Sequence, residues 1–419
     1  MKVTLVSQYF PPEPAGGPQR MGDLARQLVL LGHQARIVAP VPNYPEGKPP
    51  AGYTGKAFHT EAFEGAVIWR AWVPPVATRG TLRRLLLQLC FLLTGLFALS
   101  FVRGSEAVVA NSPTLFSGLL GWLLARLARA KFVLYVGDLY PESALATQVL
   151  RPGWQMRALD GLASFLYTHS DHLVTTTRGQ RRRLLERGLA PEKLSVAPNG
   201  ADLPPAEAKE AFPWLRAKHN LDGKILALYA GNFGVAQRLE TLLEAAALLK
   251  SREDIVFVLM GAGSRLPELK ARALELGLER VIFEPQAPRS LMPGAFASAD
   301  IALIALQNAP VFRDVLPSKL FDYLAWGLPI VASAEGETAD LLREAEAGVS
   351  VAPERPEELA QAIIKLADDP ARRLEMRLKG PDFIARGYTR RHAAASFEEA
   401  LLQLANDKKA AVFCSDSPH

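Results

Sequence analysis

Short apolar runs of strand length recur along the chain, and each is followed by a stretch with the spacing of an amphipathic helix. Such runs are typical of strands buried on both faces of a parallel sheet, and their alternation with helices predicts repeated strand–helix units. Half of the runs precede residue 200 and half follow it. They are Val3–Val6, Ala35–Val38, Ala107–Val109, Phe132–Val136, His172–Thr175, Ile225–Tyr229, Val256–Met260, Val281–Phe283, Ile301–Ile304 and Pro329–Ala332.

A proline-rich, loop-like stretch, Pro198–Pro213, separates the two sets of runs. We therefore predict an α/β protein of two doubly wound, Rossmann-like domains, residues 1–200 and 201–390, facing each other across a cleft. Ligands of open parallel sheets bind beyond the carboxyl ends of the strands, so the cleft is the predicted ligand site. Residues 391–419 are expected to form a C-terminal helix, near 394–405, and a polar tail.

One segment, Leu85–Val102, departs from the alternation because it is almost entirely apolar and carries arginines on both sides. Eighteen residues are at the low end for a membrane span. The basic flanks favour a helix that docks on an anionic membrane surface, and a buried core helix and a true span are the alternatives. The flanking arginines are Arg79, Arg83, Arg84 and Arg103.

The composition, 49% hydrophobic and 22% charged over 419 residues, is that of a globular protein and excludes a disordered chain. The two cysteines, Cys90 and Cys414, lie in unrelated contexts, which excludes a disulfide scaffold and a cysteine zinc site and fits a reducing compartment. The apolar stretch at the N-terminus is too short for a signal peptide. We expect a cytoplasmic protein.

The net charge of +5 is unevenly distributed. Residues 1–200 hold 22 Lys and Arg against 12 Asp and Glu, whereas the remainder holds 26 against 31. A basic first half indicates an anionic partner such as a membrane surface, a nucleic acid or a phosphorylated substrate, and a merely soluble basic face is the alternative.

The loop after the first predicted strand contains a glycine pair, Gly16 and Gly17, directly before a predicted helix. Glycines let backbone N–H groups approach a ligand closely, and a helix N-terminus favours an anion. The loop lacks the Gly-x-Gly-x-x-Gly pattern, which disfavours a dinucleotide site. We expect Gly16 and Gly17 to leave room for a phosphate and for an acceptor.

Two strands of the second half end in glycine-containing turns. The first turn holds Asn232 and precedes Arg238, and the second holds Gly261 and Gly263. Both turns are expected at the carboxyl edge of the sheet, where nucleotides bind in this class of fold. These four residues are candidate donor-binding residues.

The densest group of candidate residues lies in Phe312–Pro329. Pro317 suits the first position of a helix, so Ser318 and Lys319 would present backbone N–H groups and an ammonium at a helix start, which suits a diphosphate. Asp322 lies on the same helix face three residues after Lys319, where a carboxylate can accept both hydroxyls of a ribose. A capped surface helix with an ion pair is the alternative.

This segment resembles the nucleotide-sugar signature of the retaining glycosyltransferases of family 4, which have the GT-B fold. That family carries Glu-x7-Glu ahead of Ala-x-Gly-x-Pro, and here Asp314 and Asp322 stand at the same spacing ahead of Ala325–Pro329. Tyr9–Gly17 is similar to the Pro-Pro-x-x-Gly-Gly entry of the family, and Ala197–Asp202 is similar to the segment that closes its first domain. The resemblance covers nearly the whole chain.

Within the family, Asp138–Ser143 and Pro317–Leu320 look most like enzymes that add fucose or N-acetylfucosamine-type sugars to lipid-linked O-antigen or capsule intermediates. The resemblance implies a metal-independent retaining transfer from a nucleotide diphosphate sugar, with UDP expected, to a polyprenyl-diphosphate-linked acceptor. It implies no cofactor, and the chain contains no Asp-x-Asp metal motif. It also implies that the C-terminal helix returns to the first domain.

The resemblance further assigns roles to individual residues. Asp314 is expected near the donor sugar and Asp322 at the ribose, with Ser318, Lys319 and Leu320 at the diphosphate.

The chain departs from the family where Asn232 and Gln237 replace an Arg and a Lys, and where Gly137 replaces a His. The departures leave Lys319 and Arg238 to bind the diphosphate. Beside Gly137, Asp138 is a candidate catalytic residue, and Glu142 is a candidate for contact with a sugar.

Three rival functions remain open. The first is a sugar-nucleotide epimerase or hydrolase on the same fold, and the second is a catalytically inactive scaffold in polysaccharide assembly at the inner face of the plasma membrane. The third is a nucleic-acid binder, suggested by Arg178 and Arg181–Arg183. That cluster lacks interleaved aromatic residues, so a solvated or lipid-facing helix is favoured and no nucleic acid is expected as a partner.

Overall fold

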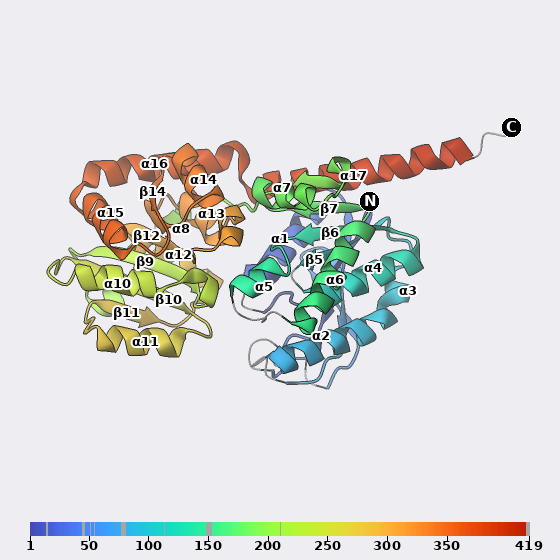
Figure 1. The fold of residues 1–419 in the computed structure, drawn as a ribbon, viewed down its shortest axis with the longest axis horizontal. Coiled ribbons are helices and arrows are strands. Elements are labelled where there is room, and N and C mark those ends of the chain that lie inside the picture. Colours follow the sequence, from blue (N-terminus) through green and yellow to red (C-terminus); the bar gives the residue numbers. More distant parts are fainter. Residues whose placement is uncertain are drawn as a thin grey trace. The chain divides into compact units, whose positions relative to one another are not determined.

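The computed structural model describes residues 1–13, 16–43, 47–50, 52–53, 55–76, 81–112, 114–147, 153–209 and 211–415. The chain forms two compact units, each an α/β unit built on a parallel sheet as predicted (Figure 1). Unit 1 comprises Met1–Pro198 and Arg390–His419, and unit 2 comprises Asn199–Thr389.

The sheet of unit 1 has the strand order β3-β4-β2-β1-β5-β6-β7-β8, in which β3 is antiparallel to β4 and the other described neighbours are parallel. Val6 of β1 lies opposite Val38 of β2 and Ala110 of β5. The strands are β1 (Lys2–Val6), β2 (Gln34–Pro40), β3 (His59–Phe63), β4 (Ala66–Ala71), β5 (Ala107–Ser112), β6 (Lys131–Val136), β7 (His172–Thr175) and β8 (Leu194–Val196).

Helices cover both faces of this sheet, because alternate side chains of each strand point to opposite sides and both sets are apolar. Helices α1 (Gly16–Leu30) and α17 (Arg390–Ser415) pack on one face, and α2 (Thr81–Gly95), α4 (Leu115–Ala128) and α6 (Trp154–His169) pack on the other. The remaining helical segments of unit 1 are η1 (Leu96–Ala98), α3 (Leu99–Val102), α5 (Glu142–Ala146), α7 (Arg178–Glu186) and η2 (Pro191–Lys193).

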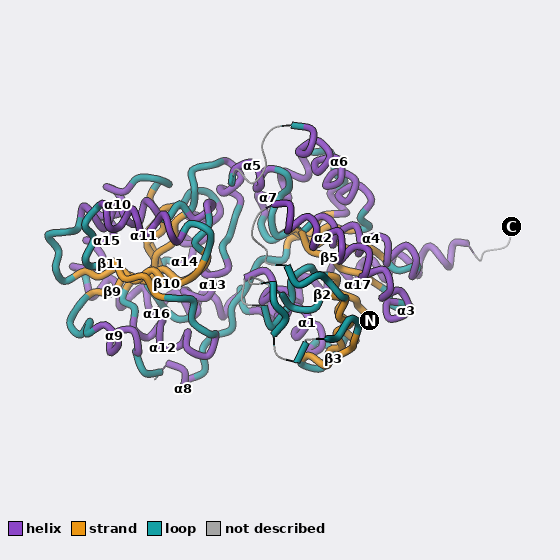
Figure 2. Tube along the Cα trace, turned by 90° about the horizontal axis from the view of Figure 1, so that it is seen from below, coloured by secondary structure: helices purple, strands orange, loops and turns teal. Residues whose placement is uncertain are grey.

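Unit 2 contains a parallel sheet with the order β11-β10-β9-β12-β13-β14, lying between two layers of helices (Figure 2). The strands are β9 (Ile225–Asn232), β10 (Ile255–Ala262), β11 (Val281–Glu284), β12 (Ile301–Ala305), β13 (Ile330–Ser333) and β14 (Gly348–Val351).

One helix layer of unit 2 contains α10 (Glu240–Leu248), α11 (Leu266–Glu275) and α15 (Pro356–Asp368), which share a core with β9, β10 and β12. The other helical segments are α8 (Ala206–Lys209), α9 (Trp214–His219), η3 (Val235–Gln237), η4 (Arg289–Leu291), α12 (Met292–Ser298), η5 (Pro310–Asp314), α13 (Ser318–Ala325), α14 (Glu337–Ala345) and α16 (Pro370–Gly387).

All ten strands expected from the apolar runs are present. The sequence analysis missed β3, β4, β8 and β14, which are short or carry polar residues at alternate positions. Pro317 is the N-cap of α13, one position before the first helical residue, because its ψ of 138° is extended. The expectation that Pro317 occupies the first helical position was therefore wrong.

The apolar segment expected at Leu85–Val102 is helical, as α2, η1 and α3. Its inner side is buried, with Leu87 and Phe91 at 2% and 0% exposure, and Gly95 lets it approach Leu120 of α4, since a Cβ there would lie 2.3 Å from the Leu120 Cδ2 atom. By length and composition, Arg83–Val102 could cross a membrane, and 28% of its most apolar window is buried. Arg79 lies outside the described residues.

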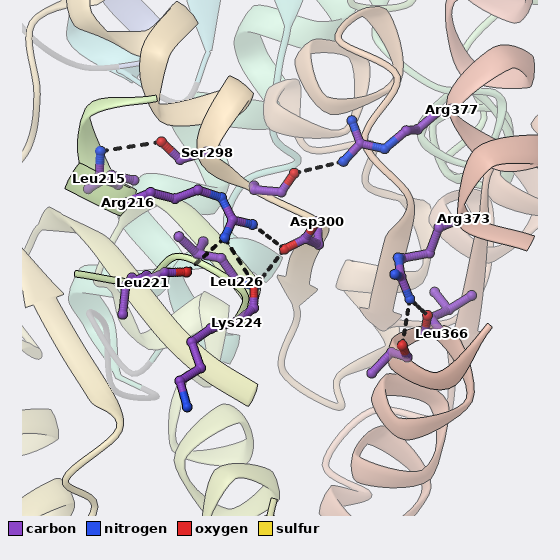
Figure 3. Close-up of polar contacts among 12 residues, drawn as sticks. Leu215, Arg216, Leu221, Lys224, Leu226, Ser298, Asp300, Leu366, Arg373 and Arg377 are labelled. Atoms are coloured by element: carbon purple, nitrogen blue, oxygen red, sulfur yellow. Dashed lines mark hydrogen bonds and ion pairs between the residues drawn. The ribbon is translucent and has the colours of Figure 1, made fainter. Parts of the chain in front are cut away.

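The amino ends of β9 and β12 are held by an ion pair between Arg216 of α9 and Asp300 (Figure 3). Asp300 Oδ2 also accepts the N–H of Leu226, at 2.8 Å. The Nη1 atom of Arg216 donates to the carbonyls of Leu221 and Lys224, each at 2.9 Å. This network joins the chain entering unit 2 to the sheet at the edge opposite its carboxyl ends.

In unit 1, the buried guanidinium of Arg70 supports the loop that follows β1. Its nitrogens donate to the carbonyls of Pro11 (2.6 Å) and Pro40 (3.2 Å), and its Nε bonds to the carboxylate of Glu61 (2.7 Å). Arg70 is 1% exposed, whereas the side chain of Glu61 is 26% exposed.

We expect Arg70→Met to lower the free energy of unfolding of unit 1 by about 1–3 kcal/mol, because it removes a fully buried donor from the carbonyls of Pro11 and Pro40. Arg343→Met is the matched control, because Arg343 pairs with Asp340 on the surface and such pairs contribute less than about 1 kcal/mol. Chemical denaturation measures both, and equal losses would contradict the role of Arg70.

Candidate functional site

The carboxyl edge of the unit 2 sheet is shaped by the close approach of two backbone turns. Gly231 at the end of β9 lies opposite Gly261 of β10, and both have positive φ angles, 152° and 156°. A Cβ at Gly261 would lie 1.8 Å from the carbonyl oxygen of Gly231, so no side chain fits there. At Gly263, a Cβ would lie 2.3 Å from the carbonyl oxygen of Phe233. These glycines are needed for the packing of the two turns.

The side chain of Lys319 enters this edge from the first turn of α13. Its Nζ atom lies 3.6 Å from the centre of the Tyr229 ring, and a Cβ on Gly231 would lie 2.5 Å from that atom. Gly231 therefore leaves the space that the ammonium occupies. A cation over an aromatic face is stabilised by about 2 kcal/mol when it is shielded from water.

Tyr229 itself is fixed by a second contact. Its hydroxyl donates to the carbonyl of Asn232, at 2.7 Å, and burial raises the pKa of Tyr229 well above its ordinary value, with Tyr323 adding to the shift. Tyr323 of α13 accepts a hydrogen bond from the N–H of Ala230, at 2.8 Å. Tyr323 thus joins α13 to the end of β9 through its hydrogen bond with Ala230, and the ring of Tyr229 contacts the Nζ atom of Lys319.

The ammonium of Lys319 has no hydrogen-bond partner among the described residues, and its Nζ atom is shielded from solvent. Burial alone holds the pKa of Lys319 well below its ordinary value. The ring of Tyr229 cannot accept the three hydrogen bonds that an ammonium can donate. The arrangement is therefore suited to an anionic ligand that supplies oxygen acceptors at the carboxyl end of the sheet.

Other predicted donor-site residues of unit 2 differ in their exposure and in their hydrogen-bond partners. Arg238 has its Nε atom 3.4 Å from Glu354 and is 46% exposed at its side chain. Gln237 accepts the N–H of Gly234 (3.1 Å) and lies at 3.5 Å from the amide of Asn232. Leu320 is fully buried, and its N–H donates to the carbonyl of Pro317. Neither its side chain nor its N–H is therefore available to a ligand.

The two aspartates of the signature lie at different depths. Asp314 closes η5 and is 3% exposed, whereas Asp322 is half-buried on α13, four residues after Ser318. The loop after β13 packs against η5, because a Cβ at Gly336 would lie 2.1 Å from the carbonyl oxygen of Arg313. Ser318, Lys319 and Asp322 lie among the first five residues of α13, and the Lys319 side chain reaches Gly231.

The predicted site residues of unit 1 lie in two places: Asp138 follows the end of β6, and Gly16 and Gly17 begin α1. Burial raises the pKa of Asp138, and the charge of Arg20 on α1 opposes the shift. A Cβ on Gly137 would lie 2.5 Å from a guanidinium nitrogen of Arg20, so the glycine makes room for that side chain. Gly16 and Gly17 begin α1, and a Cβ on Gly17 would meet no atom within 4 Å.

Two family models match the chain, and together they cover most of it. Residues 15–200 match the family described as a glycosyl transferase 4-like domain, and residues 212–382 match the glycosyl transferases group 1. The chain belongs to these GT-B glycosyltransferases.

One relative of the enzyme matches nearly its full length, and another matches about two thirds of it. It is 28% identical, across 97% of its chain and 99% of the relative, to the putative colanic acid biosynthesis glycosyl transferase WcaI of Escherichia coli K12. It is 29% identical, across 64% of its chain and 67% of the relative, to the probable glycosyltransferase WbjE of Pseudomonas aeruginosa. HepE of Anabaena in complex with UDP-glucose has the same fold, with a TM-score of 0.70 and 15% identity over 98% of this chain and 100% of that one.

The sequence analysis of this glycosyltransferase missed Tyr229 and Tyr323, although both lie next to segments that it singled out. It assigned Tyr229 to a strand and Tyr323 to a helix. A tyrosine that directly precedes an Ala-Gly turn could have been noted as a polar group inside an apolar run, but its partner is ninety residues away in the sequence.

We expect Lys319→Met to stabilise the ligand-free glycosyltransferase, because it removes a buried nitrogen without a partner, whose burial costs about 1–3 kcal/mol. The pKa of Lys319 is depressed in the folded protein, so the unfolded chain binds this proton more tightly. Wild-type stability should then rise as the pH climbs toward the unfolded pKa of about 10.4, and its deficit against the variant should shrink.

Thermal unfolding, from neutral pH to about pH 10, measures the difference in stability between the wild type and Lys319→Met. Lys270→Met, at an exposed lysine of α11, is the matched control and should change the melting temperature little. A Lys319→Met variant that is less stable than the wild type at neutral pH would contradict the costly burial.

Proposed function

We propose that this glycosyltransferase moves a sugar, with retention of configuration, from a UDP-sugar to a lipid-linked glycan in surface polysaccharide biosynthesis. The unpaired ammonium of Lys319 at the carboxyl edge of unit 2 carries the donor half of the proposal, because a diphosphate supplies the missing acceptors. The names of WcaI and WbjE and the UDP-glucose complex of HepE support the reaction class and the nucleotide. An N-acetylated or deoxy hexose such as N-acetylfucosamine is the proposed sugar.

In this proposal unit 2 binds the donor and unit 1 binds the acceptor. The bond between the anomeric carbon and the diphosphate oxygen breaks, a bond to an acceptor hydroxyl oxygen forms, and the hydroxyl proton leaves with the diphosphate. Lys319 and the N–H groups at the start of α13, with Ser318, stabilise the charge on the leaving diphosphate. Asp322 binds the ribose, and Asp314 and Asp138 act near the sugar.

Binding of the diphosphate also affects the pKa of Lys319. Without an anion, burial disfavours the charged form, and a diphosphate beside the Nζ atom favours it. A bound diphosphate is therefore expected to raise the pKa of Lys319. Tyr229 keeps the Nζ atom in place in both states.

We further propose that unit 1 places the enzyme at the inner face of the plasma membrane. Four side chains of α2 and η1 recur at spacings that put them on one helix face, and they are exposed: Leu86 (46%), Leu89 (38%), Leu93 (65%) and Phe97 (72%). Arg83 and Arg84 are exposed at the start of the same helix. An apolar stripe beside basic residues suits the boundary of an anionic membrane, with the acceptor lipid remaining in the bilayer.

We expect UDP to bind the full chain and to raise its melting temperature, with weaker or no shifts from GDP, ADP and dTDP. Lys319→Met should abolish the shift and lower transfer by about 100-fold or more, the effect of removing one preorganised electrostatic group, while Lys270→Met should leave both unchanged. Titration calorimetry with UDP measures the Kd of the wild type and of each variant. Full UDP affinity in Lys319→Met would contradict the role of Lys319, and no shift with any nucleotide would favour a scaffold.

The membrane proposal is tested by sedimentation with phosphatidylglycerol vesicles. Leu93→Ser with Phe97→Ser should release the protein, and Arg83→Glu with Arg84→Glu should release it and weaken the salt dependence. Leu374→Ser with Leu378→Ser is the matched control, because these leucines are 61% and 66% exposed on α16 of unit 2. Unchanged sedimentation of the α2 variants, or equal loss in the control, would contradict the proposal.

A further inference from the structure

Two residues at the carboxyl edge of the unit 2 sheet have backbone conformations that favour glycine, and they form an ion pair with each other. Arg238, directly after η3, has a φ of 41°, and Glu354, between β14 and α15, has a φ of 60°. The Nε atom of Arg238 lies 3.4 Å from the Oε2 atom of Glu354. A residue other than glycine in this left-handed region costs free energy, and such residues cluster at functional sites.

The other four non-glycine residues with positive φ in the described ranges occupy ordinary turns. Arg129, Asn220 and Glu346 directly follow the ends of α4, α9 and α14, and helices commonly end on a residue in this conformation. Glu64 lies in the turn between the paired strands β3 and β4. Glu354 neither ends a helix nor joins two paired strands, so its conformation has no such explanation.

Glu354 contacts loops that follow three different strands. Its Oε1 atom accepts the N–H of Asn308, in the loop after β12, at 2.9 Å. Its own N–H donates to the hydroxyl of Ser333, at the end of β13, at 3.2 Å. Its Oε2 atom faces Arg238, which follows β9 and η3. Because the ends of β12 and β13 hold Glu354 in place, its carboxylate can fix the position of Arg238.

A line of contacts joins Arg238 to the turn that holds the Lys319 ammonium. Gln237, the residue before Arg238, has its Oε1 atom 3.5 Å from the Nδ2 atom of Asn232. Asn232 follows Gly231, on which a Cβ would lie 2.5 Å from the Nζ atom of Lys319. The two cations therefore belong to one connected part of the carboxyl edge.

The guanidinium of Arg238 keeps donors for a further anion. Its side chain is 46% exposed, and one carboxylate cannot accept all five N–H groups of a guanidinium. The charge of Arg238 also acts on Glu240 of α10, but Glu240 is paired with Arg265 at 2.7 Å. Guanidinium groups bind phosphate oxygens through charge-assisted, often bidentate hydrogen bonds, so a diphosphate is a suitable second partner.

We propose that Glu354 is a positioning residue that orients Arg238 toward the diphosphate of the donor. The inference rests on the proposed function, in which unit 2 binds a UDP-sugar, and it adds a residue that the sequence analysis did not single out. An exposed arginine loses side-chain freedom when it binds a ligand, and earlier fixation by Glu354 lowers that cost. The pair also accounts for charged residues at two positions whose φ favours glycine.

The negative charge of Glu354 makes the proposal distinguishable from two other roles. If Glu354 only competed with the diphosphate for Arg238, removing its charge would strengthen the binding of UDP. If Glu354 only supported the fold, its replacement would affect UDP binding equally with and without Arg238. If Glu354 acts through Arg238, its replacement weakens UDP binding only while Arg238 is present.

The test is titration calorimetry of the full chain with UDP and with uridine, which lacks the diphosphate. The variants are Arg238→Met, Glu354→Gln and the two combined. Glu354→Gln keeps the length of the side chain and an acceptor for the N–H of Asn308. Glu358→Gln is the matched control, because Glu358 is exposed on α15. Melting temperatures are measured on the same samples.

We expect Arg238→Met to raise the Kd of UDP by about 10-fold, the effect of losing a charge-assisted hydrogen bond, and Glu354→Gln to raise it by about 3- to 5-fold. The double variant should match Arg238→Met, and Glu358→Gln should match the wild type. The Kd of uridine should be unchanged, and the melting temperatures should change little because the pair is partly exposed.

Three results would overturn the inference. They are UDP binding by Glu354→Gln that is as tight as in the wild type or tighter, an equal effect of Glu354→Gln in the Arg238→Met background, and a loss of uridine binding as large as that of UDP binding. Failure of the proposed function is distinguishable, because the wild type would then bind no UDP, and the inference would fail with it.

Discussion

Helices cover both faces of a parallel sheet, so polar ligands bind at the ends of its strands. This constraint limits the possible ligand sites of each unit to the strand ends. In unit 2 the edge is formed by Gly231 and Gly261, whose backbones approach too closely for any side chain. The space left by the missing side chain of Gly231 is occupied by the Nζ atom of Lys319. The absence of a side chain at these glycines thus explains both the close packing of the turns and the position of the Lys319 Nζ atom.

The same edge holds a polar group whose burial is unfavourable in the free protein. The ammonium of Lys319 is shielded from solvent, and burial holds its pKa well below the ordinary value. At the amino edge of unit 2, by contrast, Arg216 and Asp300 satisfy each other and the nearby backbone. In unit 2, a shielded cation without a hydrogen-bond partner among the described residues thus lies at the carboxyl edge, and a satisfied network lies at the amino edge.

The apolar helix of unit 1 serves two environments. Leu87 and Phe91 pack into the core under the sheet, whereas Leu93 and Phe97 remain exposed on the outer side. A helix that is apolar on all sides needs apolar surroundings on all sides, and the unit itself supplies them only on one. The membrane surface proposed above supplies the other. In that proposal, one side of the segment is buried in the unit and the other side contacts lipid.

The sequence by itself determined ten of the fourteen strands in the described residues, because runs such as Val3–Val6 and Ile225–Tyr229 are apolar at consecutive positions. It also determined the helix that begins at Ser318. It also identified Lys319 by charge and position. Only the tertiary structure decided that Tyr229 carries the Lys319 ammonium and that Arg238 lies beside Glu354. The partners in both pairs are far apart in the sequence, and whether a polar atom is buried or paired depends on which distant segments fold against it.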